Sequence, residues 1–239
     1  MINEIQSELE KNSSKKQKIS GENYLKGSVM RGLKMNQILE VYGVFKSRIK
    51  KLSTDEKISL ALMLFKSKYF SDKRFAIQIF ADNIKEFDNS ILSDFFELFD
   101  TYINDWATCD VLSSKVISKL ILKDNSIIDI MIAWSKSNKT WAKRASIISF
   151  VNLANKGDYD GTIINISQNL IKNDFRFIQL GVGWCLRNLS QKNLTLVLGF
   201  IKKNYSHFSR EGLRYAVEKM NPELKTKVLK NDFLESVVF

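Results

Sequence analysis

The sequence has almost no proline. Pro222 is the single proline in 239 residues, and the alternating Val, Ile and Thr runs that would indicate strands are nearly missing as well. Proline breaks helix interiors, so its scarcity favours uninterrupted helices. Apolar residues instead recur with a helical period in stretches such as 57–68, 74–86, 142–155 and 178–189. We therefore predict helices nearly everywhere and no sheet.

Metal-ligating and nucleophilic residues are also few. The chain has one histidine, His207, and two cysteines, Cys109 and Cys185, neither of which has a partner at CxxC spacing. These are too few soft ligands for a zinc site, and a single histidine argues against Ser-His-Asp catalysis. The GxSxG, P-loop and GxGxxG motifs are missing. We predict no metal, no cofactor and two buried thiols in an intracellular protein.

Long apolar runs are missing too. No run reaches the ~20 residues that a membrane span needs. Residues 1–20 are polar, without the apolar segment typical of a signal peptide. We expect this partly flexible stretch to hold a short amphipathic helix and then a linker at 11–18. The whole chain, 1–239, is expected to form a single helical-repeat domain and to act as a monomer.

Positive charge is in excess. The chain has 37 Lys and Arg against 26 Asp and Glu, which gives a net charge of +11. Such a surplus favours a polyanionic partner, most simply nucleic acid. A lysine-rich composition from AT-biased coding would produce the same balance, and the many Ile and Asn residues fit that alternative.

Five stretches resemble one another at intervals of about 35 residues. Each begins with small polar residues and continues into an apolar helix; the starts lie at Ser71, Asn104, Asn138, Asn173 and Ser206. Aligning them places a small or apolar residue in register in every stretch, with spacings of 35, 34, 36 and 35; these residues are Ala76, Val111, Ala145, Gly181 and Ala216. A helical period of this size is typical of a helical solenoid.

The same register brings four unusual residues onto one predicted stripe. With the aligned residue as position zero, Asp110 and Arg144 lie at minus one, Trp106 at minus five and Trp184 at plus three. These offsets differ by four, and residues four apart share a helix face. Trp141 lies off the stripe, which predicts a core position. The alternative for the stripe is that its tryptophans pack in the core and its carboxylate is an ordinary surface acid.

Basic residues occur near the predicted starts of the second helix of each repeat. They are Lys73, Arg74, Lys143, Arg144, Arg176 and Arg210. The helix dipole disfavours cations at that end, so helix stability alone does not explain them. Exposed amides together with a cation would bind a phosphate there, which favours DNA binding.

At these residues the chain resembles the AlkD-type alkylpurine DNA glycosylases, which are all-helical proteins of HEAT-like repeats. The motifs that carry the resemblance run through most of the sequence: Tyr24-Leu25-Lys26, Trp106-x-x-x-Asp110, Trp141-x-x-Arg144-Ala145, Phe177-Ile178-Gln179 leading to Gly183-Trp184-x-Leu186-Arg187, and Ser209-Arg210-Glu211. The resemblance implies a cleft in which Trp106 and Trp184 flank the damaged base. It further implies that Asp110 is catalytic, that Arg144 holds a backbone phosphate and that Tyr24 lies along the same DNA track.

The chain departs from the pattern of that family in two places. Asp105 precedes the first motif tryptophan and Ala107 follows it, and the region from Gly32 to Asn36 has no proline-containing turn. We expect these departures to affect rate and lesion range rather than the type of reaction.

The sequence thus predicts an all-α, HEAT-like helical-repeat solenoid with a concave basic cleft. The expected function is hydrolysis of the N-glycosidic bond of purines alkylated at N3 or N7 in double-stranded DNA, in the cytoplasm and in association with the nucleoid. No lysine is placed to attack the sugar, so we expect a monofunctional glycosylase. The residues expected to contact DNA are Tyr24, Lys26, Lys73, Arg74, Lys143, Arg176, Arg187, Arg210 and Arg214. The alternative is a non-catalytic helical-repeat module that binds nucleic acid or a protein. A protein-binding scaffold should instead present an apolar or acid-rich concave face.

Overall fold

The chain forms helices throughout. A computed structural model describes residues 1–156 and 158–232, and within those ranges the only β pairing consists of two isolated bridges. The prediction of an all-α protein is confirmed. The chain divides at Asp124 and Asn125 into two compact units, which we call the amino-terminal and the carboxyl-terminal unit. A single domain over 1–239 stays a prediction.

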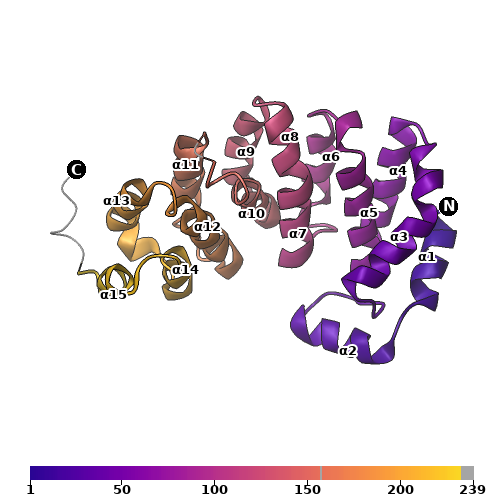
Figure 1. The fold of residues 1–239 in the computed structure, drawn as a ribbon, viewed down its shortest axis with the longest axis horizontal. Helices are drawn as coiled ribbons and strands as arrows, with labels where there is room; N and C mark the ends of the chain where they lie inside the picture. Colours follow the sequence, from indigo (N-terminus) through magenta and orange to yellow (C-terminus); the bar gives the residue numbers. More distant parts are fainter. Residues whose placement is uncertain (157, 233–239) are drawn as a thin grey trace. The chain divides into compact units, whose positions relative to one another are not determined.

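The amino-terminal unit consists of eight α-helices and two other helical segments (Figure 1). In chain order they are α1 (Ile2–Lys11), α2 (Lys15–Tyr24), α3 (Met35–Lys50), α4 (Thr54–Phe65), α5 (Phe70–Asp82), the 3₁₀ segment η1 (Ile84–Glu86), α6 (Ile91–Leu98), α7 (Trp106–Leu112), the π-helical segment η2 (Ser113–Ile117) and α8 (Ser118–Lys123).

The described part of the carboxyl-terminal unit consists of seven α-helices and one 3₁₀ segment (Figure 1). They are α9 (Ile127–Ser135), α10 (Thr140–Ile148), α11 (Asp160–Leu170), α12 (Arg176–Leu189), α13 (Leu194–Asn204), η3 (Tyr205–His207), α14 (Arg210–Ala216) and α15 (Pro222–Lys230).

The predicted repeat is present as a series of second helices. Helices α5, α7, α10, α12 and α14 begin at residues 70, 106, 140, 176 and 210, so the successive differences are 36, 34, 36 and 34. Within each unit these helices pack on their neighbours, for example α5 on α4, α10 on α9 and α12 on α14. The register read from the sequence therefore identified the repeating element correctly.

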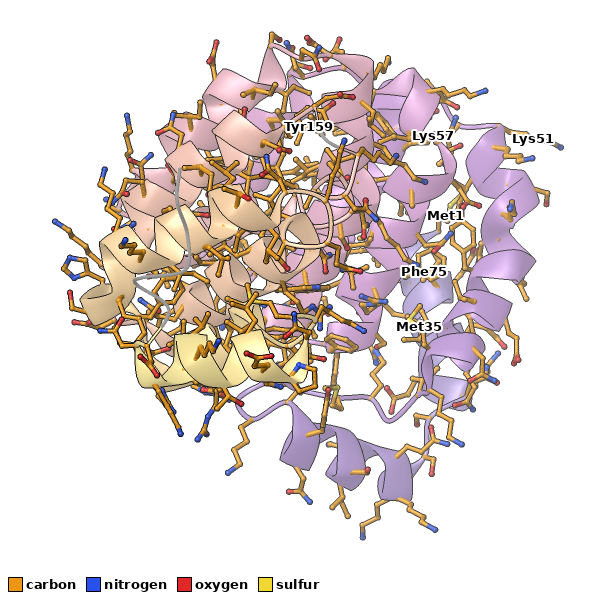
Figure 2. All side chains as sticks on the ribbon, turned by 60° about the vertical axis from the view of Figure 1, so that its left-hand side comes forward. Met1, Met35, Lys51, Lys57, Phe75 and Tyr159 are labelled. Carbon is orange, nitrogen blue, oxygen red and sulfur yellow. The ribbon has the colours of Figure 1, made fainter. Side chains whose placement is uncertain are left out.

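The core of the amino-terminal unit is built on phenylalanines. Phe80, which is fully buried, lies 6.3 Å from Phe65, 5.1 Å from Phe87 and 5.0 Å from Phe95 between ring centroids. A buried aromatic side chain removes some of the largest apolar areas from water, and edge-to-face pairs add to that gain. Phe75, labelled in Figure 2, is buried on the same helix as Phe80 and contacts the rings of α3. The apolar face of α5 thus holds α3, α4 and α6 together.

The amino-terminal segment is more helical than the sequence predicts. The amphipathic helix is present as α1, with Ile5 and Leu9 fully buried. The expected linker at 11–18 is wrong for most of its length, because α2 begins at Lys15 and leaves three residues between the helices. Helix α2 buries none of its residues and lies across the ends of α1 and α3 in Figure 1. It shows no apolar stripe because it packs on little.

A close backbone approach explains how α2 is held. Gly32 has a φ of +98°, and a Cβ atom there would lie 2.2 Å from the carbonyl oxygen of Ser14. The amide of Ser14 donates to the carbonyl of Gly32 at 2.9 Å. Only glycine allows both this conformation and this contact. The start of α2 is therefore tied directly to the segment that leads into α3.

A buried ion pair anchors the same segment to α5. Asp72, which is fully buried, accepts hydrogen bonds from Nε and Nη2 of Arg31 at 2.8 and 3.0 Å. Ser67 and Gln6 donate to the same carboxylate at 2.8 and 3.0 Å. A buried charge needs several such partners to offset its lost hydration. The network fixes the loop after α2, and with it the position of Tyr24.

One predicted helix ends early. The sequence predicts helix over 142–155, but α10 ends at Ile148 and the chain continues in tight turns. The amides of Phe150 and Val151 donate to carbonyls three residues back rather than four. The side-chain amide of Asn188 donates a hydrogen bond to the Val151 carbonyl at 2.9 Å. Burial of the apolar residues continues through the turns, so the apolar pattern alone did not mark the end of the helix.

Candidate functional site

An aromatic pair stands out in the amino-terminal unit. The rings of Tyr24 and Trp106 lie edge to face, with centroids 5.7 Å apart and planes inclined by 70°. Tyr24 is the last residue of α2 and is 75% exposed, whereas Trp106 is the first residue of α7 and is half-buried. An exposed aromatic ring held by another ring offers a preformed apolar face to a flat ligand.

The start of α7 is set by Asp105. This residue is extended, with φ −132° and ψ 150°, and its carboxylate accepts a hydrogen bond from the amide of Thr108 at 2.7 Å. An aspartate at this position caps the helix by satisfying one of its unpaired amides. The family departure noted at Asp105 therefore has a structural role, since this cap determines where Trp106 stands.

Asp110 follows Trp106 by one helical turn. Its side chain is 7% exposed, and residues four apart share a face of α7. The π segment η2 begins directly after Leu112, and the hydroxyl of Ser113 donates to the carbonyl of Cys109 at 2.8 Å. Short π segments inside α-helices are frequent at functional sites. A buried carboxylate beside such a segment and an aromatic pair is a strong candidate for catalysis.

In the carboxyl-terminal unit, Arg144 lies beneath α12. Its side chain is 4% exposed, and its Nη1 donates to the backbone carbonyl of Phe177. A Cβ atom on Gly181 would lie 3.3 Å from the same nitrogen. Because position 181 carries no side chain, the guanidinium can sit against the helix that carries Trp184.

Trp184 stacks on a residue that the sequence reasoning missed. Its ring lies 6.4 Å from that of Tyr215, with planes inclined by 21°. The guanidinium of Arg187 stands over the Tyr215 ring at 4.8 Å and pairs with Glu218 at 2.9 Å. The stack thus fixes an indole and a guanidinium together.

The repeat register contained the signal for Tyr215. With Ala216 as the aligned residue, Tyr215 lies at minus one, which is the position of Asp110 and Arg144 in their repeats. The signal for Tyr215 is therefore its place in the repeat, since a lone phenol is neither charged nor an indole.

Close helix packing makes this stack possible. A Cβ atom on Gly183 would lie 2.5 Å from the carbonyl oxygen of Gly212, which is closer than real contacts allow. The side chain of Gln179 reinforces the crossing by donating to the carbonyl of His207 at 3.1 Å and accepting from the amide of Ser209 at 3.0 Å. Gly183 and Gly212 thus bring α12 and α14 together.

The predicted DNA-binding cations of the amino-terminal unit differ in exposure. Lys26 is exposed. Lys73 is 7% exposed and donates to the carbonyl of Tyr102, and burial lowers its pKa, an effect that Asp105 and Asp72 oppose. Burial also lowers the pKa of Arg74, which Asp105 again opposes. The Nε of Arg74 has no hydrogen-bond partner among the described residues.

Most of the corresponding cations in the carboxyl-terminal unit already have protein partners. Arg176 forms two hydrogen bonds with Glu211, at 2.6 and 2.7 Å, and these raise the pKa of the arginine and lower that of the glutamate. Arg210 donates to a backbone carbonyl of α15 at 2.6 Å. Arg214 is exposed and Lys143 is half-buried. These surface pairs are weak and salt-sensitive, so a phosphate can compete for the cations.

The two cysteines are buried, as the sequence predicted. Cys109 and Cys185 are both fully buried, and burial raises the pKa of the Cys185 thiol. Over residues 1–156 and 158–232, no group of three or more His, Cys, Asp or Glu side chains could hold a metal ion. In the same ranges, no helix is long and apolar enough to cross a bilayer.

The four stripe residues come from both units: Trp106 and Asp110 from one, Arg144 and Trp184 from the other. Their arrangement as one stripe, and the concave basic cleft around it, stay predictions. Each unit has an aromatic pair that includes a second-helix residue, and a buried charged side chain on a second helix.

Comparison with known proteins identifies the family and the fold. Residues 5–220 match the family model described as DNA alkylation repair enzyme. A solved structure described as "Predicted DNA alkylation repair enzyme from Enterococcus faecalis" shares the fold, with a TM-score of 0.77 and 15% identity, and the match covers 88% of this chain and 98% of that one. No curated protein matches. The chain belongs to the DNA alkylation repair enzyme family.

Proposed function

We propose that the protein is a monofunctional DNA glycosylase that hydrolyses the N-glycosidic bond of N3- or N7-alkylated purines in double-stranded DNA. The observation that carries the proposal is the buried carboxylate of Asp110, one turn after the Tyr24–Trp106 pair. The family match supports a DNA repair enzyme. We expect it to act as a monomer in the cytoplasm, associated with the nucleoid, without a metal or cofactor.

The chemistry explains why so few catalytic groups suffice. A purine alkylated at N3 or N7 already carries a positive charge, so it leaves as a neutral base without first being protonated. The bond between C1′ and the ring nitrogen breaks, and the electron pair departs with the base. Water then adds to C1′ and loses a proton, which leaves an abasic deoxyribose.

Asp110 would act on the sugar in this reaction. As the bond breaks, positive charge develops on the deoxyribose, and a carboxylate in a site of low dielectric stabilises that charge. The same carboxylate can accept a hydrogen bond from the attacking water and orient it. Burial at 7% exposure strengthens both interactions, because little water screens them.

The aromatic and basic groups would bind and position the DNA. The faces of Trp106 and Trp184 attract a cationic base, a contact of order 0.5–2 kcal/mol. Tyr24 holds Trp106 by its edge contact. Arg144 would hold a backbone phosphate, a contact that sets register without reading sequence. Tyr24 and the predicted DNA-binding lysines and arginines would contact the rest of the duplex.

Base release from methylated duplex DNA tests the proposal. The wild-type protein should release N3-methyladenine or N7-methylguanine, and Asp110→Asn should do so ~10²–10³-fold more slowly, because one preorganised electrostatic group is removed. Affinity for DNA should hold or rise slightly, since a carboxylate repels phosphates. The urea unfolding curve of each protein separates loss of catalysis from loss of fold. Equal release by both proteins, or release by neither, would leave the non-catalytic binding module as the better description.

A further inference from the structure

Three loops of the amino-terminal unit enclose a small cavity. They are 27–29 before α3, 66–68 before α5 and 101–105 before α7, and the first turn of α5 completes the lining. The cavity has a volume of about 280 Å³. Pockets for drug-sized ligands measure ~300–1,000 Å³, so this one suits a single small group such as a phosphate with part of a sugar.

The charges that line the cavity are mostly positive. Lys66, Lys68 and Lys73 line it, and Asp105 is the one acidic residue among the lining residues. Lys66 and Lys68 are exposed, so their ammonium groups can reach a ligand at the mouth. The carboxylate of Asp105 is engaged with the amide of Thr108 as the cap of α7. The lining therefore favours an anion.

Lys73 adds a buried positive charge to the lining of the cavity. Its ammonium group is bonded to the Tyr102 carbonyl, and its side chain is 7% exposed. Burial lowers its pKa although Asp105 and Asp72 act in the opposite direction. Asp72 itself is held by Arg31 at 2.8 Å, so its charge is largely offset. The buried cation is thus incompletely compensated within the protein, and an anion in the cavity would complete its environment.

The cavity lies beside the aromatic pair. Asp105 in its wall directly precedes Trp106, and Gly27 in its wall follows Tyr24 by three residues. Tyr24 and Trp106 are in ring contact. A nucleotide that touches the pair would therefore bring its own backbone, or that of its neighbour, to the mouth of the cavity.

We propose that this cavity binds one phosphodiester group of the DNA strand that Tyr24 and Trp106 contact, through Lys66, Lys68 and the buried Lys73. The inference rests on the proposed function, because it takes DNA as the ligand of the aromatic pair. It adds Lys66 and Lys68 to the DNA-binding residues, and it assigns Lys73 to the lining of a phosphate site.

The test is the salt dependence of binding to an undamaged duplex, measured by fluorescence anisotropy, for wild type and Lys66→Ala/Lys68→Ala. Both lysines are exposed, so the variant should remain folded. Each phosphate contact contributes about −0.9 to the slope of log K against log[salt], so the variant should lose about that amount. Its affinity should fall on the order of three- to tenfold at low salt.

A matched control removes the same charge elsewhere. Lys50→Ala/Lys51→Ala changes two exposed lysines at the other end of α3, about 24 Å from its first turn at 1.5 Å per residue. Figure 2 shows Met35 and Lys51 at these opposite ends. The control should keep the wild-type slope. If Lys66→Ala/Lys68→Ala also keeps that slope, or the control loses as much, the cavity does not hold a phosphate.

A second arm separates DNA phosphate from free phosphate. Inorganic phosphate titrated into the protein should bind weakly and be displaced when the duplex is added. Tight binding that the duplex does not displace would overturn the proposal and indicate a site for a free anion. These readouts concern binding alone, so they stand even if wild type releases no base, which is the outcome that would reject the proposed function.

Discussion

The rings of Tyr24 and Trp106 lie edge to face, with centroids 5.7 Å apart and planes inclined by 70°. These residues are the last of α2 and the first of α7, and more than 80 positions separate them in the chain. The contact joins a helix that buries none of its residues to the helix that carries the candidate catalytic carboxylate. It gives α2 a part in the site that packing alone would not.

Removing the phenol should therefore weaken catalysis without unfolding the protein. Edge-to-face pairs are worth ~0.5–1.5 kcal/mol, so Tyr24→Ala should release base about 2- to 10-fold more slowly. Because Tyr24 is 75% exposed, the urea unfolding midpoint of Tyr24→Ala should match that of the wild-type protein. Single-turnover release from methylated duplex measures the effect, and Tyr24→Phe, which keeps the ring, should stay near the wild-type rate. Equal rates for Tyr24→Ala and wild type would show that the pair takes no part.

Two tryptophans of the carboxyl-terminal unit should have different roles, Trp141 in stability and Trp184 in catalysis. Trp141 is 8% exposed and lies 5.7 Å from Phe175 and 5.8 Å from Phe177, so Trp141→Ala should cost ~3–5 kcal/mol of unfolding free energy. Trp184 is half-buried on Tyr215, so Trp184→Ala should mainly slow base release, by ~2- to 30-fold. Urea unfolding and base release are measured on both variants. The opposite pattern would mean that the two faces are exchanged.

Two glycine substitutions should change stability in opposite directions. A Cβ atom at position 183 would meet the Gly212 carbonyl at 2.5 Å, and backbone cannot move aside cheaply, so Gly183→Ala should cost ~1–3 kcal/mol. It should also slow base release by separating Trp184 from Tyr215. Gly43 lies inside α3 with no atom within 4 Å of its Cβ position, so Gly43→Ala should stabilise by ~0.5–1 kcal/mol. Urea unfolding of the two variants, measured side by side, checks both signs.

Binding of the wild-type protein to undamaged duplex should be independent of sequence and sensitive to salt. Four to seven phosphate contacts are expected from the basic residues near the starts of second helices, so log K against log[salt] should slope between roughly −3.5 and −6. Arg144→Ala should weaken binding to all sequences alike and reduce the slope by about one. Anisotropy titrations over a range of salt concentrations measure both. A slope near zero would exclude DNA as the ligand.

The sequence by itself determined the class of fold, the repeating element and its register. Ala76, Ala145 and Ala216 fall in register because each second helix packs the same face, and that face must be apolar in every repeat. The register also identified Trp141 as buried, and the apolar character of free thiols identified both cysteines as buried. Buried positions recur in the sequence with the helical period, so features that depend on burial alone could be predicted.

Tertiary structure alone decided the features that depend on partners distant in the chain. Helix α2 carries no apolar stripe, and it is held by Ser14, by Gly32 and by the ring of Trp106. The sequence placed Lys73 at a helix start, but only the tertiary structure shows that it lines a cavity and that its ammonium group donates to a carbonyl 29 residues away. The placement of such groups depends on which loops meet in space, and no local periodicity records that.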